Sequence, residues 1–368
     1  MNFEELGIRK DLIKGLNDLK IISPTQIQSE VIPLLINESK DLVGQAQTGT
    51  GKTAAYGLPL LQRIEPKRKV VQGLILCPTR ELGQQVAKQL FKFTKYTDKI
   101  FTEAVYGGAP IEKQISALRR PTHIIVATPG RLIDLVKRKA VDLSHVKVII
   151  LDEADEMLSM GFKTELDEIL GHLSKSKEKW LFSATLPHGI RQIINQHLSE
   201  DAYKIEVSGR NVVNSHINHQ YIICDEYDKL NVLLKFLKTQ VENRGLIFCK
   251  TKAATQKLAK QLKAKNISAD AIHGDLLQKE RDKVMRAFKN ESLQILIATD
   301  LAARGIDVPD LAYVVHFQMP DQDEYYTHRS GRTARAGKKG LSYCIVSSAE
   351  MRTVRNLEKN LKIVFTQV

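Results

Sequence analysis

The sequence predicts an α/β protein made of two tandem domains, each a mostly parallel sheet flanked by helices. Short, continuously apolar and β-branched runs alternate with helix-period segments along the whole chain. Such runs are typical of strands that are buried on both faces of a parallel sheet. The chain has 368 residues, which exceeds one ordinary core, so we expect two domains of about 150–200 residues each.

The first half of the chain contains seven strand candidates separated by helical segments, of which 80–93 and 162–173 are the clearest. Each strand candidate is short and rich in Val, Ile and Leu, as strands of a buried sheet are. The seven candidates are 42–46, 73–77, 102–106, 123–127, 146–151, 180–183 and 203–207.

A polar segment with turn-forming residues, 208–216, is the best candidate for a linker. We therefore expect an N-terminal domain over 1–207 and a C-terminal domain over 217–368, ending in a helix over 351–361. The run Leu-Ile-Leu-Cys-Pro-Thr in the first half is echoed by Leu-Ile-Phe-Cys-Lys-Thr in the second, which suggests two related domains. The strand candidates of the second half are 218–224, 245–249, 269–273, 293–298, 312–317 and 341–346.

Composition narrows the possible partners and the compartment. The net charge of +13 and the pI near 9.4 favour a polyanionic partner. An aromatic content of 6% argues against a surface that mainly stacks bases. No apolar run has membrane-span length, and the N-terminus lacks a signal-peptide pattern. The cysteines have no metal or redox spacing and fit a reducing cytoplasm, with Cys77, Cys249 and Cys344 expected in the core.

A glycine-rich turn between the first strand candidate and the following helix has the pattern of a phosphate-binding loop. Gly49 and Gly51 let the backbone N–H groups point inward at phosphate oxygens, and the helix adds the positive end of its dipole. Lys52 would neutralise the β- and γ-phosphates, and the Thr53 hydroxyl would ligate Mg²⁺. The alternative is a turn that binds nothing, and Ala46 replaces the usual first glycine. The loop is Ala46, Gln47, Thr48, Gly49, Thr50, Gly51, Lys52 and Thr53.

A second motif, about a hundred residues later, is an apolar strand that ends in carboxylates at 152–155. Asp152 would hold Mg²⁺, in part through water. Glu153 would orient or deprotonate the water that attacks the γ-phosphate. Taken alone, the same residues fit a solvated acidic helix start equally well.

Residues 152–155 read Asp-Glu-Ala-Asp, the signature of the DEAD-box RNA helicases, and the chain resembles that family over nearly its whole length. The resemblance implies two RecA-like domains, ATP and Mg²⁺ as cofactors, and RNA as a partner gripped by its backbone. It also implies ATP hydrolysis coupled to local, non-processive unwinding of RNA duplexes or to remodelling of RNA–protein complexes.

The resemblance assigns roles to further residues of the first domain. Phe3 and the segment 24–28 match the adenine-reading motif, in which the Gln28 amide can bond the N6 and N7 edge of adenine. Asp155, Ser183 and Thr185 match the residues that couple the two domains. The residues that match RNA-binding motifs are Pro78, Thr79, Arg80, Gly107, Gly108, Thr128, Pro129, Gly130 and Arg131. Of these, Thr128 and Pro129 also fit plain capping of a helix, and Arg80 fits an exposed charge.

In the second domain the resemblance implies arginine fingers at Arg332 and Arg335, which would share a face if they lie on a helix. Without it, a basic solvated face would be the better interpretation. Asp307 would bond the ATP ribose, and His328 would join the coupling residues. The RNA contacts of this domain would be Thr251, Gln278, Arg281 and Thr299.

Few residues depart from the family pattern. Lys20 and Ile21 stand where Gly and Phe are usual, so an aromatic stack on adenine becomes an aliphatic contact. We expect weaker ATP binding with the adenine preference retained. Ser330 and Ala334 replace Ile and Gly, and Gly83 replaces Ala.

Three alternatives stay open: an ATP-gated RNA clamp with little unwinding, whose motifs would be the same, a DNA translocase of the same superfamily, and an unrelated phosphate-loop enzyme for small substrates. The chain stops about thirty residues after Arg335, as a minimal helicase core or a core whose tail was cut away would. We expect this core to be monomeric, and the sequence does not identify its physiological RNA.

Overall fold

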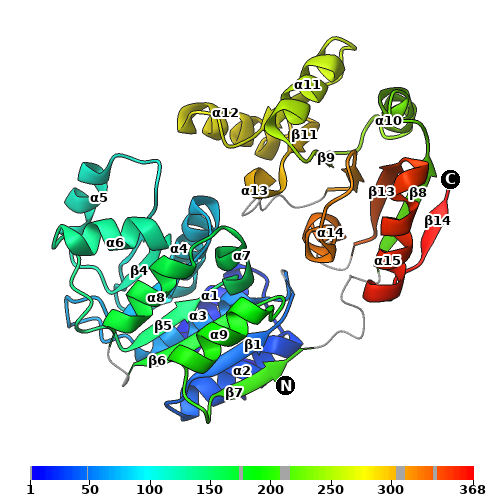
Figure 1. Ribbon diagram of the computed structural model, residues 1–368. Coiled ribbons are helices and arrows are strands. Elements are labelled where there is room, and N and C mark those ends of the chain that lie inside the picture. The colour runs from blue at the N-terminus through cyan, green and yellow to red at the C-terminus, as the bar shows by residue number, and fades with distance from the viewer. Residues whose placement is uncertain (1, 48, 174–176, 208–215, 304–310, 335–337) are drawn as a thin grey trace. The chain divides into compact units, whose positions relative to one another are not determined.

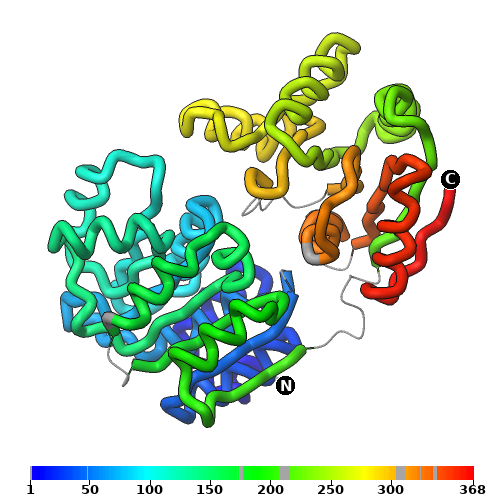
Figure 2. The backbone as a smooth tube through the Cα atoms, viewed as in Figure 1, coloured from blue at the N-terminus to red at the C-terminus, as the bar shows by residue number. Residues whose placement is uncertain are grey.

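The computed structural model describes residues 2–47, 49–173, 177–207, 216–303, 311–334 and 338–368 (Figure 1). The chain divides into two compact units, Met1–Ser208 (unit 1) and Gly209–Val368 (unit 2). Figure 2 follows the backbone from blue to green through unit 1 and from green to red through unit 2. Of the predicted linker, only His216 lies within the described residues.

Unit 1 is built on a sheet of seven parallel strands in the order β3-β4-β2-β5-β6-β1-β7. Its central strands are apolar throughout and fully buried, as expected for a sheet that is covered on both faces. The strands are β1 (Leu42–Gln45), β2 (Gly73–Leu76), β3 (Thr102–Val105), β4 (Ile124–Ala127), β5 (Val148–Leu151), β6 (Glu178–Ser183) and β7 (Tyr203–Glu206).

Helices cover both faces of this sheet (Figure 1). Alternate strand residues belong to two separate cores, because successive side chains of a strand point to opposite faces: Ile75 packs with α1–α4, and Leu74 and Leu76 pack with α6–α9. The helices are α1 (Lys10–Asp18), α2 (Gln26–Asn37), α3 (Lys52–Arg63), α4 (Arg80–Phe93), α5 (Ile111–Leu118), α6 (Pro129–Lys137), α7 (Ala154–Ser159), α8 (Lys163–His172) and α9 (His188–His197), with a 3₁₀ turn η1 (Thr94–Tyr96).

Unit 2 repeats this plan. Its seven parallel strands follow the order β10-β11-β9-β12-β13-β8-β14, which is the order of unit 1 when the strands are numbered from β8. The strands are β8 (Ile217–Ile223), β9 (Gly245–Phe248), β10 (Ala269–Ile272), β11 (Ile295–Ala298), β12 (Tyr313–His316), β13 (Gly340–Val346) and β14 (Phe365–Gln367).

The helices of unit 2 bury three apolar clusters against its sheet. One lies under α10 and α11, a second under α12 and α13, and a third under α14 and α15. The helices are α10 (Lys229–Lys238), α11 (Lys252–Lys263), α12 (Gln278–Lys289), α13 (Asp300–Ala303), α14 (Asp323–Ser330) and α15 (Met351–Leu361), with a 3₁₀ turn η2 (Ser348–Glu350).

The predicted fold class is confirmed: all thirteen predicted strands are present, and only the short β14 was missed. Cys77, Cys249 and Cys344 are buried, and the four cysteines are free thiols. Within the described ranges no helix is long and apolar enough to cross a membrane. Because all strands of a sheet are parallel, the loops after their carboxyl ends meet at one edge, where α/β proteins bind ligands.

Candidate nucleotide and nucleic-acid site

The glycine-rich loop follows β1, which lies between β6 and β7. Gly49 and Gly51 have φ of +82° and +91°, the left-handed region that favours glycine, and Gly51 caps α3. A Cβ on Gly51 would lie 2.3 Å from Gln28 Nε2, so the loop also needs glycine for close approach. Thr48 lies outside the described residues.

The loop lysine points across the loop. Lys52 is the first residue of α3 and is only 6% exposed, and its Nζ donates to the carbonyl oxygen of Ala46 at 2.9 Å. The Thr50 hydroxyl donates to the Gln47 carbonyl oxygen at 2.7 Å, which closes the turn. An ammonium beside a helix N-terminus makes this loop a positive site for an anion.

Asp152 follows β5, whose carboxyl end lies at the same edge of the sheet. The Tyr56 hydroxyl donates to Asp152 Oδ2 at 2.7 Å and also interacts with the Thr53 side chain, so the two candidate Mg²⁺ ligands share one hydroxyl neighbour. Burial raises the pKa of the Asp152 carboxyl, against the opposing effects of the Lys52 ammonium and the Tyr56 hydroxyl. Asp152 Oδ1 is buried and has no hydrogen-bond partner among the described residues. An orphaned carboxylate oxygen beside a hydroxyl fits a hard cation such as Mg²⁺.

The next residues of the motif form a compact polar cluster. The N–H and hydroxyl of Thr185 both donate to Asp155 Oδ2 at 2.8 Å, and the Asp155 N–H donates to Ser183 Oγ at 3.2 Å. The Ser183 hydroxyl donates to the Thr185 carbonyl oxygen, and the Ala46 N–H donates to the Ser183 carbonyl oxygen at 2.9 Å. These bonds join the predicted coupling residues to the phosphate loop. Glu153 stands between Asp152 and Asp155 in the chain and caps α7, with a φ of +51° in the left-handed region.

The predicted adenine-reading segment is bonded to the same loop. The Thr25 hydroxyl donates to the Thr50 carbonyl oxygen at 2.8 Å, and Gln28 Nε2 donates to the Gly51 carbonyl oxygen at 3.0 Å. Gln28 Oε1 accepts from the Thr25 N–H at 2.9 Å, so each end of the amide has one hydrogen-bonding position left. Phe3 is only 2% exposed and packs in the core under α1–α4. As placed, its ring is a core side chain and offers no open face to a base.

The RNA-binding candidates of unit 1 follow the neighbouring strands β3, β4 and β2. Thr79 caps α4 and accepts from the Leu82 N–H at 3.2 Å. Thr128 caps α6, with Pro129 as its first residue, and its Oγ1 accepts from the Gly107 N–H at 3.4 Å. Gly108 has φ of +78°. The structure therefore gathers Pro78–Arg80, Gly107–Gly108 and Thr128–Arg131 at one edge, although they are far apart in the sequence.

Two arginines of this group differ in their surroundings. The Arg80 guanidinium lies 4.7 Å from the centre of the Tyr106 ring, a cation–π contact. Arg131 donates through one NH₂ group to the Ala109 carbonyl oxygen at 3.0 Å. Its Nε and other NH₂ group are buried without a partner among the described residues. Buried donors of a guanidinium without acceptors suit a phosphate ligand.

The candidates of unit 2 follow the neighbouring strands β10, β11 and β9. Gln278 and Arg281 lie on α12 after β10, Thr299 follows β11 and Thr251 follows β9. Thr251 caps α11 and accepts from the Ala254 N–H at 3.1 Å. Thr299 is 9% exposed and accepts from the Ala302 N–H at 3.4 Å. Arg281 donates to the Ala302 carbonyl oxygen at 2.9 Å, so α12 and α13 meet beside these threonines. Gln278 is the first residue of α12 and bonds Asp282.

Arg332 does not lie on a helix, so the condition under which it would share a face with Arg335 is not met. The helix α14 ends at Ser330, and Ala334 has a φ of +55°. The backbone therefore leaves helical geometry between Ser330 and Ala334. Arg332 is 8% exposed and its Nε donates to the His328 carbonyl oxygen at 3.2 Å. His328 lies half-buried on α14. Asp307 and Arg335 lie outside the described residues.

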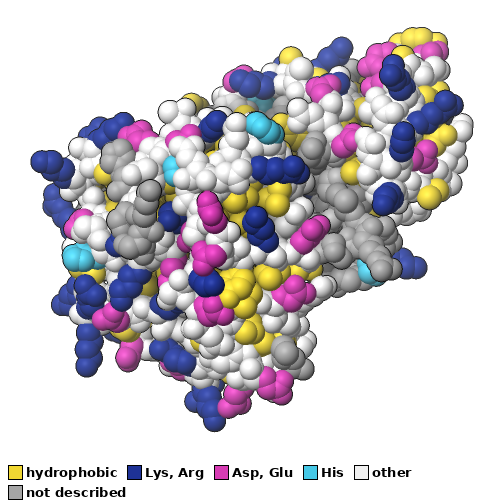
Figure 3. Space-filling view, turned by 60° about the horizontal axis from the view of Figure 1, so that its bottom comes forward, with side chains coloured by type: hydrophobic (Ala, Val, Ile, Leu, Met, Phe, Trp, Pro, Cys, Tyr) yellow, Lys and Arg dark blue, Asp and Glu magenta, His cyan; other side chains and the backbone are white. Residues whose placement is uncertain are grey.

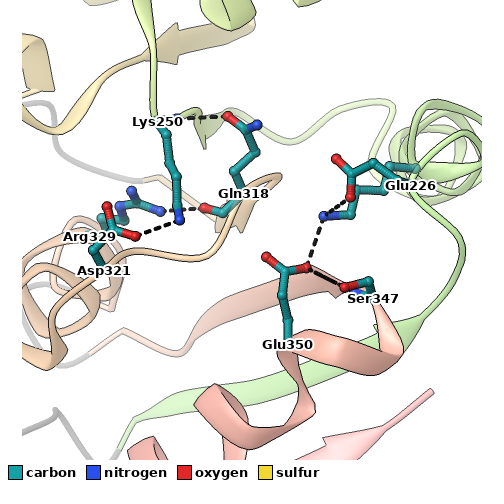
Figure 4. A network of polar contacts seen from close by, with 8 residues as sticks. Glu226, Lys250, Gln318, Asp321, Arg329, Ser347 and Glu350 are labelled. Carbon is teal, nitrogen blue, oxygen red and sulfur yellow. Dashed lines mark hydrogen bonds and ion pairs between the residues drawn. The ribbon is translucent and has the colours of Figure 1, made fainter.

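Sequence reasoning missed the residue that anchors α14. Arg329 is 1% exposed and binds both Asp300 oxygens, at 2.5 and 2.7 Å, and the Gln318 carbonyl oxygen at 2.7 Å. Figure 4 shows Arg329 and Lys250 both bonded to Gln318, and Lys250 also paired to Asp321. A bidentate pair to Asp300 ties α14 to α13. The sequence did contain a signal for this ion pair: Arg329 stands between His328 and Ser330, and Asp300 directly follows Thr299.

A second missed feature is a polar network beneath α14. Ser330, one of the departures from the family pattern, is fully buried and bonds Ser342 Oγ at 3.0 Å and His316 Nε2 at 3.3 Å. The Tyr326 hydroxyl bonds Ser342 at 3.0 Å and His219 Nδ1 at 2.6 Å. Burial lowers the pKa of His219 to about 4 and that of His316 well below its ordinary value, so both rings are neutral.

Together the fold and the site define a class of protein: a phosphate-loop nucleotide-binding protein with two parallel-sheet units, of which only the first carries the loop. Comparison with known proteins gives the family. The DEAD/DEAH box helicase family matches residues 25–193, and the helicase conserved C-terminal domain matches residues 228–337.

Two relatives are similar over nearly the whole chain. The DEAD-box ATP-dependent RNA helicase CshA of Bacillus cereus is 41% identical over 98% of this chain and 68% of its own length. The solved structure of S. cerevisiae Dbp5 bound to RNA and ADP BeF3 has a TM-score of 0.92 and 32% identity, covering 100% of this chain and 95% of that one. The chain belongs to the DEAD-box family of ATP-dependent RNA helicases, and its two units are RecA-like domains.

Proposed function

We propose that the protein is an RNA helicase that uses ATP hydrolysis for local, non-processive unwinding of RNA duplexes or for remodelling of RNA–protein complexes. The observation that carries this proposal is the hydrogen-bonded path from Ala46 through Ser183 to Asp155 and Thr185. It links the phosphate loop to the residues whose family counterparts couple nucleotide to RNA. We assign ATP binding to residues 1–207, the linker to 208–216 and the second helicase domain to 217–368.

In this proposal unit 1 holds the nucleotide. Backbone N–H groups of 46–53 and the Lys52 ammonium bind the phosphates, and Gln28 and Phe3 belong to the adenine-reading segment. Thr53 and Asp152 would hold Mg²⁺, which when bound neutralises charge that develops on the phosphates. Glu153 orients the attacking water and accepts its proton. Asp307 of the second domain bonds the ribose.

RNA is bound at the carboxyl edges of both sheets, by backbone contacts that carry little sequence preference. In unit 1 the free donors of Arg131 and the helix starts at Thr79 and Thr128 face phosphates. RNA and ATP together stabilise a closed form in which Arg332 and Arg335 stabilise the γ-phosphate during transfer. Asp155, Ser183, Thr185 and His328 couple the domains in that form.

We further propose that the core is monomeric. We also propose that it works in the cytoplasm, since its four cysteines are free thiols, as in a reducing compartment. Ile21 lies partly buried against the core under α1–α4 and replaces an aromatic platform for adenine. ATP binding is therefore weaker than with an aromatic residue, while the Gln28 amide keeps the preference for adenine over guanine. Equal affinities for ATP and GTP would contradict the assignment of Gln28.

The test is the ATPase activity of the intact chain with RNA, with DNA of the same sequence, and with neither. We expect stimulation by RNA above that by DNA, and displacement of a short strand from a duplex with a single-stranded extension. Stronger stimulation by DNA would indicate a DNA translocase. Stimulation by RNA without strand displacement would indicate an ATP-gated clamp, and indifference to both nucleic acids would exclude the helicase proposal.

A further inference from the structure

The positive charge of unit 1 is concentrated at the edge opposite the candidate nucleotide site. Four described segments, 65–72, 94–101, 118–123 and 137–147, precede the consecutive strands β2, β3, β4 and β5 at their amino ends. They carry eleven exposed Lys and Arg residues against three exposed Asp and Glu residues. The rest of unit 1 has eighteen Lys and Arg against twenty-two Asp and Glu, so its balance is acidic. Figure 3 shows many Lys and Arg side chains along the left side of unit 1.

We call these eleven cations the basic edge. Part of their charge is neutralised within the unit: Lys147 and Arg68 pair with Glu65, Lys95 with Asp18, and Lys137 with Glu168 at 3.2 Å, and Arg120 interacts electrostatically with Glu103. Six of them make no ion pair within the described part of the chain. The basic edge consists of Lys67, Arg68, Lys69, Lys95, Lys99, Arg119, Arg120, Lys137, Arg138, Lys139 and Lys147, and the six are Lys67, Lys69, Lys99, Arg119, Arg138 and Lys139.

A pocket shows that these segments meet in space. It has a volume of about 170 Å³, and Lys69, Arg120 and His145 line it together with the apolar Val71 and Ile125. Apart from Ile125, which lies in β4, these side chains come from the segments before β2, β4 and β5. Beside the segment before β4, the half-exposed ring of Phe101 stacks on His123 with the ring centres 5.7 Å apart. The pocket and this ring stack therefore connect the four segments that carry the cations.

We propose that the basic edge is a second RNA-binding surface, which holds the RNA that flanks the segment bound at the carboxyl edge. This inference rests on the proposed function. Adjacent strands are about 4.8 Å apart, so four of them span about 15 Å, on the order of four phosphates of one strand at about 3.4 Å each. Seven of the eleven cations are Lys, a residue depleted at protein–protein interfaces and common at phosphate contacts.

The two surfaces lie at opposite ends of the same strands. A strand of four residues is about 13 Å long, and helices cover both faces of the sheet, so an RNA that contacts both edges must pass around a layer of helices. An RNA with a flanking duplex can reach the basic edge while its single-stranded part lies at the carboxyl edge. Phosphate contacts at the basic edge would then raise affinity for structured RNA without selecting a sequence.

The test compares two RNAs on the intact chain: a single strand of about ten nucleotides and the same strand joined to a hairpin. The variant is Lys69→Glu combined with Arg120→Glu, and Lys67→Glu combined with Lys139→Glu is an independent second variant. The matched control is Lys163→Glu combined with Lys204→Glu, two exposed lysines of unit 1 in α8 and β7. Affinity is measured over a range of salt concentrations, together with ATPase activity stimulated by the short strand.

For the native chain and the control we expect the hairpin RNA to bind about tenfold more tightly than the short strand, with a steeper salt dependence. In both basic-edge variants that advantage is lost, the salt slope for the hairpin RNA falls by about two, and ATPase stimulated by the short strand is unchanged.

If the variants keep the native advantage for the hairpin RNA, or if the native chain shows none, the inference is overturned. In that case the basic edge would serve an acidic protein instead. If the short strand fails to stimulate the native ATPase, the proposed helicase function is contradicted, whereas the loss of the hairpin advantage tests only the basic edge.

Discussion

At the scale of single residues, Glu153 combines an unusual backbone conformation with the role that we propose for it toward the attacking water. It holds a left-handed conformation that costs a non-glycine residue free energy, directly after the buried Asp152 and before α7. We expect Glu153→Gln to reduce ATP turnover by about 10²–10⁴-fold, because a positioned base contributes that much. ATP and RNA binding should remain, giving a complex that dissociates slowly. Turnover and RNA release with ATP present measure both effects; loss of ATP-dependent RNA affinity in this variant would contradict the role of Glu153 toward water.

The ionised carboxylate of Asp152 lowers the stability of the folded chain when no cation is bound to it. Because folding raises its pKa, its ionised form at neutral pH costs folding free energy, and this cost disappears as the pH falls through the folded-state pKa. Asp152→Asn removes the charge and keeps an acceptor for the Tyr56 hydroxyl. We expect the variant without nucleotide to unfold at a temperature at least as high as the native chain, and to lose the further rise with MgATP. A lower unfolding temperature without nucleotide would contradict this account.

The sequence was enough to predict which residues lie together in the site, but it did not predict the hydrogen bonds and packing contacts that they make. The order of motifs along the chain indicated that Asp155, Ser183 and Thr185 belong together. The bond from Gln28 to Gly51 joins segments 23 residues apart and depends on how α2 packs against α3. The burial of Phe3 likewise depends on the packing of the N-terminal segment.

At the scale of elements, the turn that ends α1 contains a lysine, Lys20, in a left-handed backbone conformation that glycine usually occupies. The Lys20 N–H bonds the Asn17 carbonyl oxygen and the Ile21 N–H bonds the Leu16 carbonyl oxygen, the pattern in which a helix ends with a left-handed residue, usually glycine. Lys20 occupies that position with φ of +59°. We expect Lys20→Gly to raise the free energy of unfolding of unit 1 by about 0.5–1 kcal/mol. Urea unfolding measures it, with Lys14→Gly inside α1 as a control that should lower stability by about 1 kcal/mol.

The buried network beneath α14 predicts acid sensitivity of unit 2. His219 has a pKa of about 4 in the folded state and about 6.5 when unfolded, so the unfolded chain takes up the proton first. Stability is therefore fully present above about pH 6.5 and is lost as the pH falls toward 4, by about 1.4 kcal/mol per pH unit for each such His. Urea unfolding across this range measures the slope. An unchanged slope in His219→Gln would show that His219 is not responsible.

Among the elements, the periodic helices and the apolar strands could be predicted, whereas the strand β14 and the end of α14 could not. The bounds of α4 and α15 agree with the predicted segments, because their apolar spacing continues over three turns. The strand β14 has three residues and one buried side chain, Phe365, too little for a pattern. Gly331, a residue type that favours helix ends, follows Ser330 and caps α14, but the three-residue spacing of Arg332 and Arg335 favoured a helix that continues.

At the scale of the whole molecule, catalysis in our proposal needs a residue from each unit. Arg332→Ala should leave ATP binding intact and reduce RNA-stimulated turnover by about 10³-fold or more, the usual effect of removing an arginine finger. Arg355→Ala, an exposed arginine on α15, is the matched control and should leave turnover unchanged. Nucleotide affinity and turnover are measured on the intact chain. Equal turnover in the two variants would remove Arg332 from the mechanism.

The net charge of +13 follows from the sequence, but its distribution does not. Segments 65–72 and 137–147 are far apart in the chain and meet only because β2 and β5 are neighbours in a parallel sheet. Strand order is set by packing and by crossovers, which one sequence does not reveal.

The identical strand order of the two units places Lys229 where unit 1 has Lys52, since each begins the helix after the corresponding strand. Lys229 is 2% exposed and is held by Glu226 at 2.9 Å and Glu350 at 3.0 Å (Figure 4). The loop before it, 224–228, contains no glycine. Unit 2 thus supplies its own carboxylates to the ammonium that would otherwise meet a phosphate. We therefore expect one nucleotide per polypeptide at saturation.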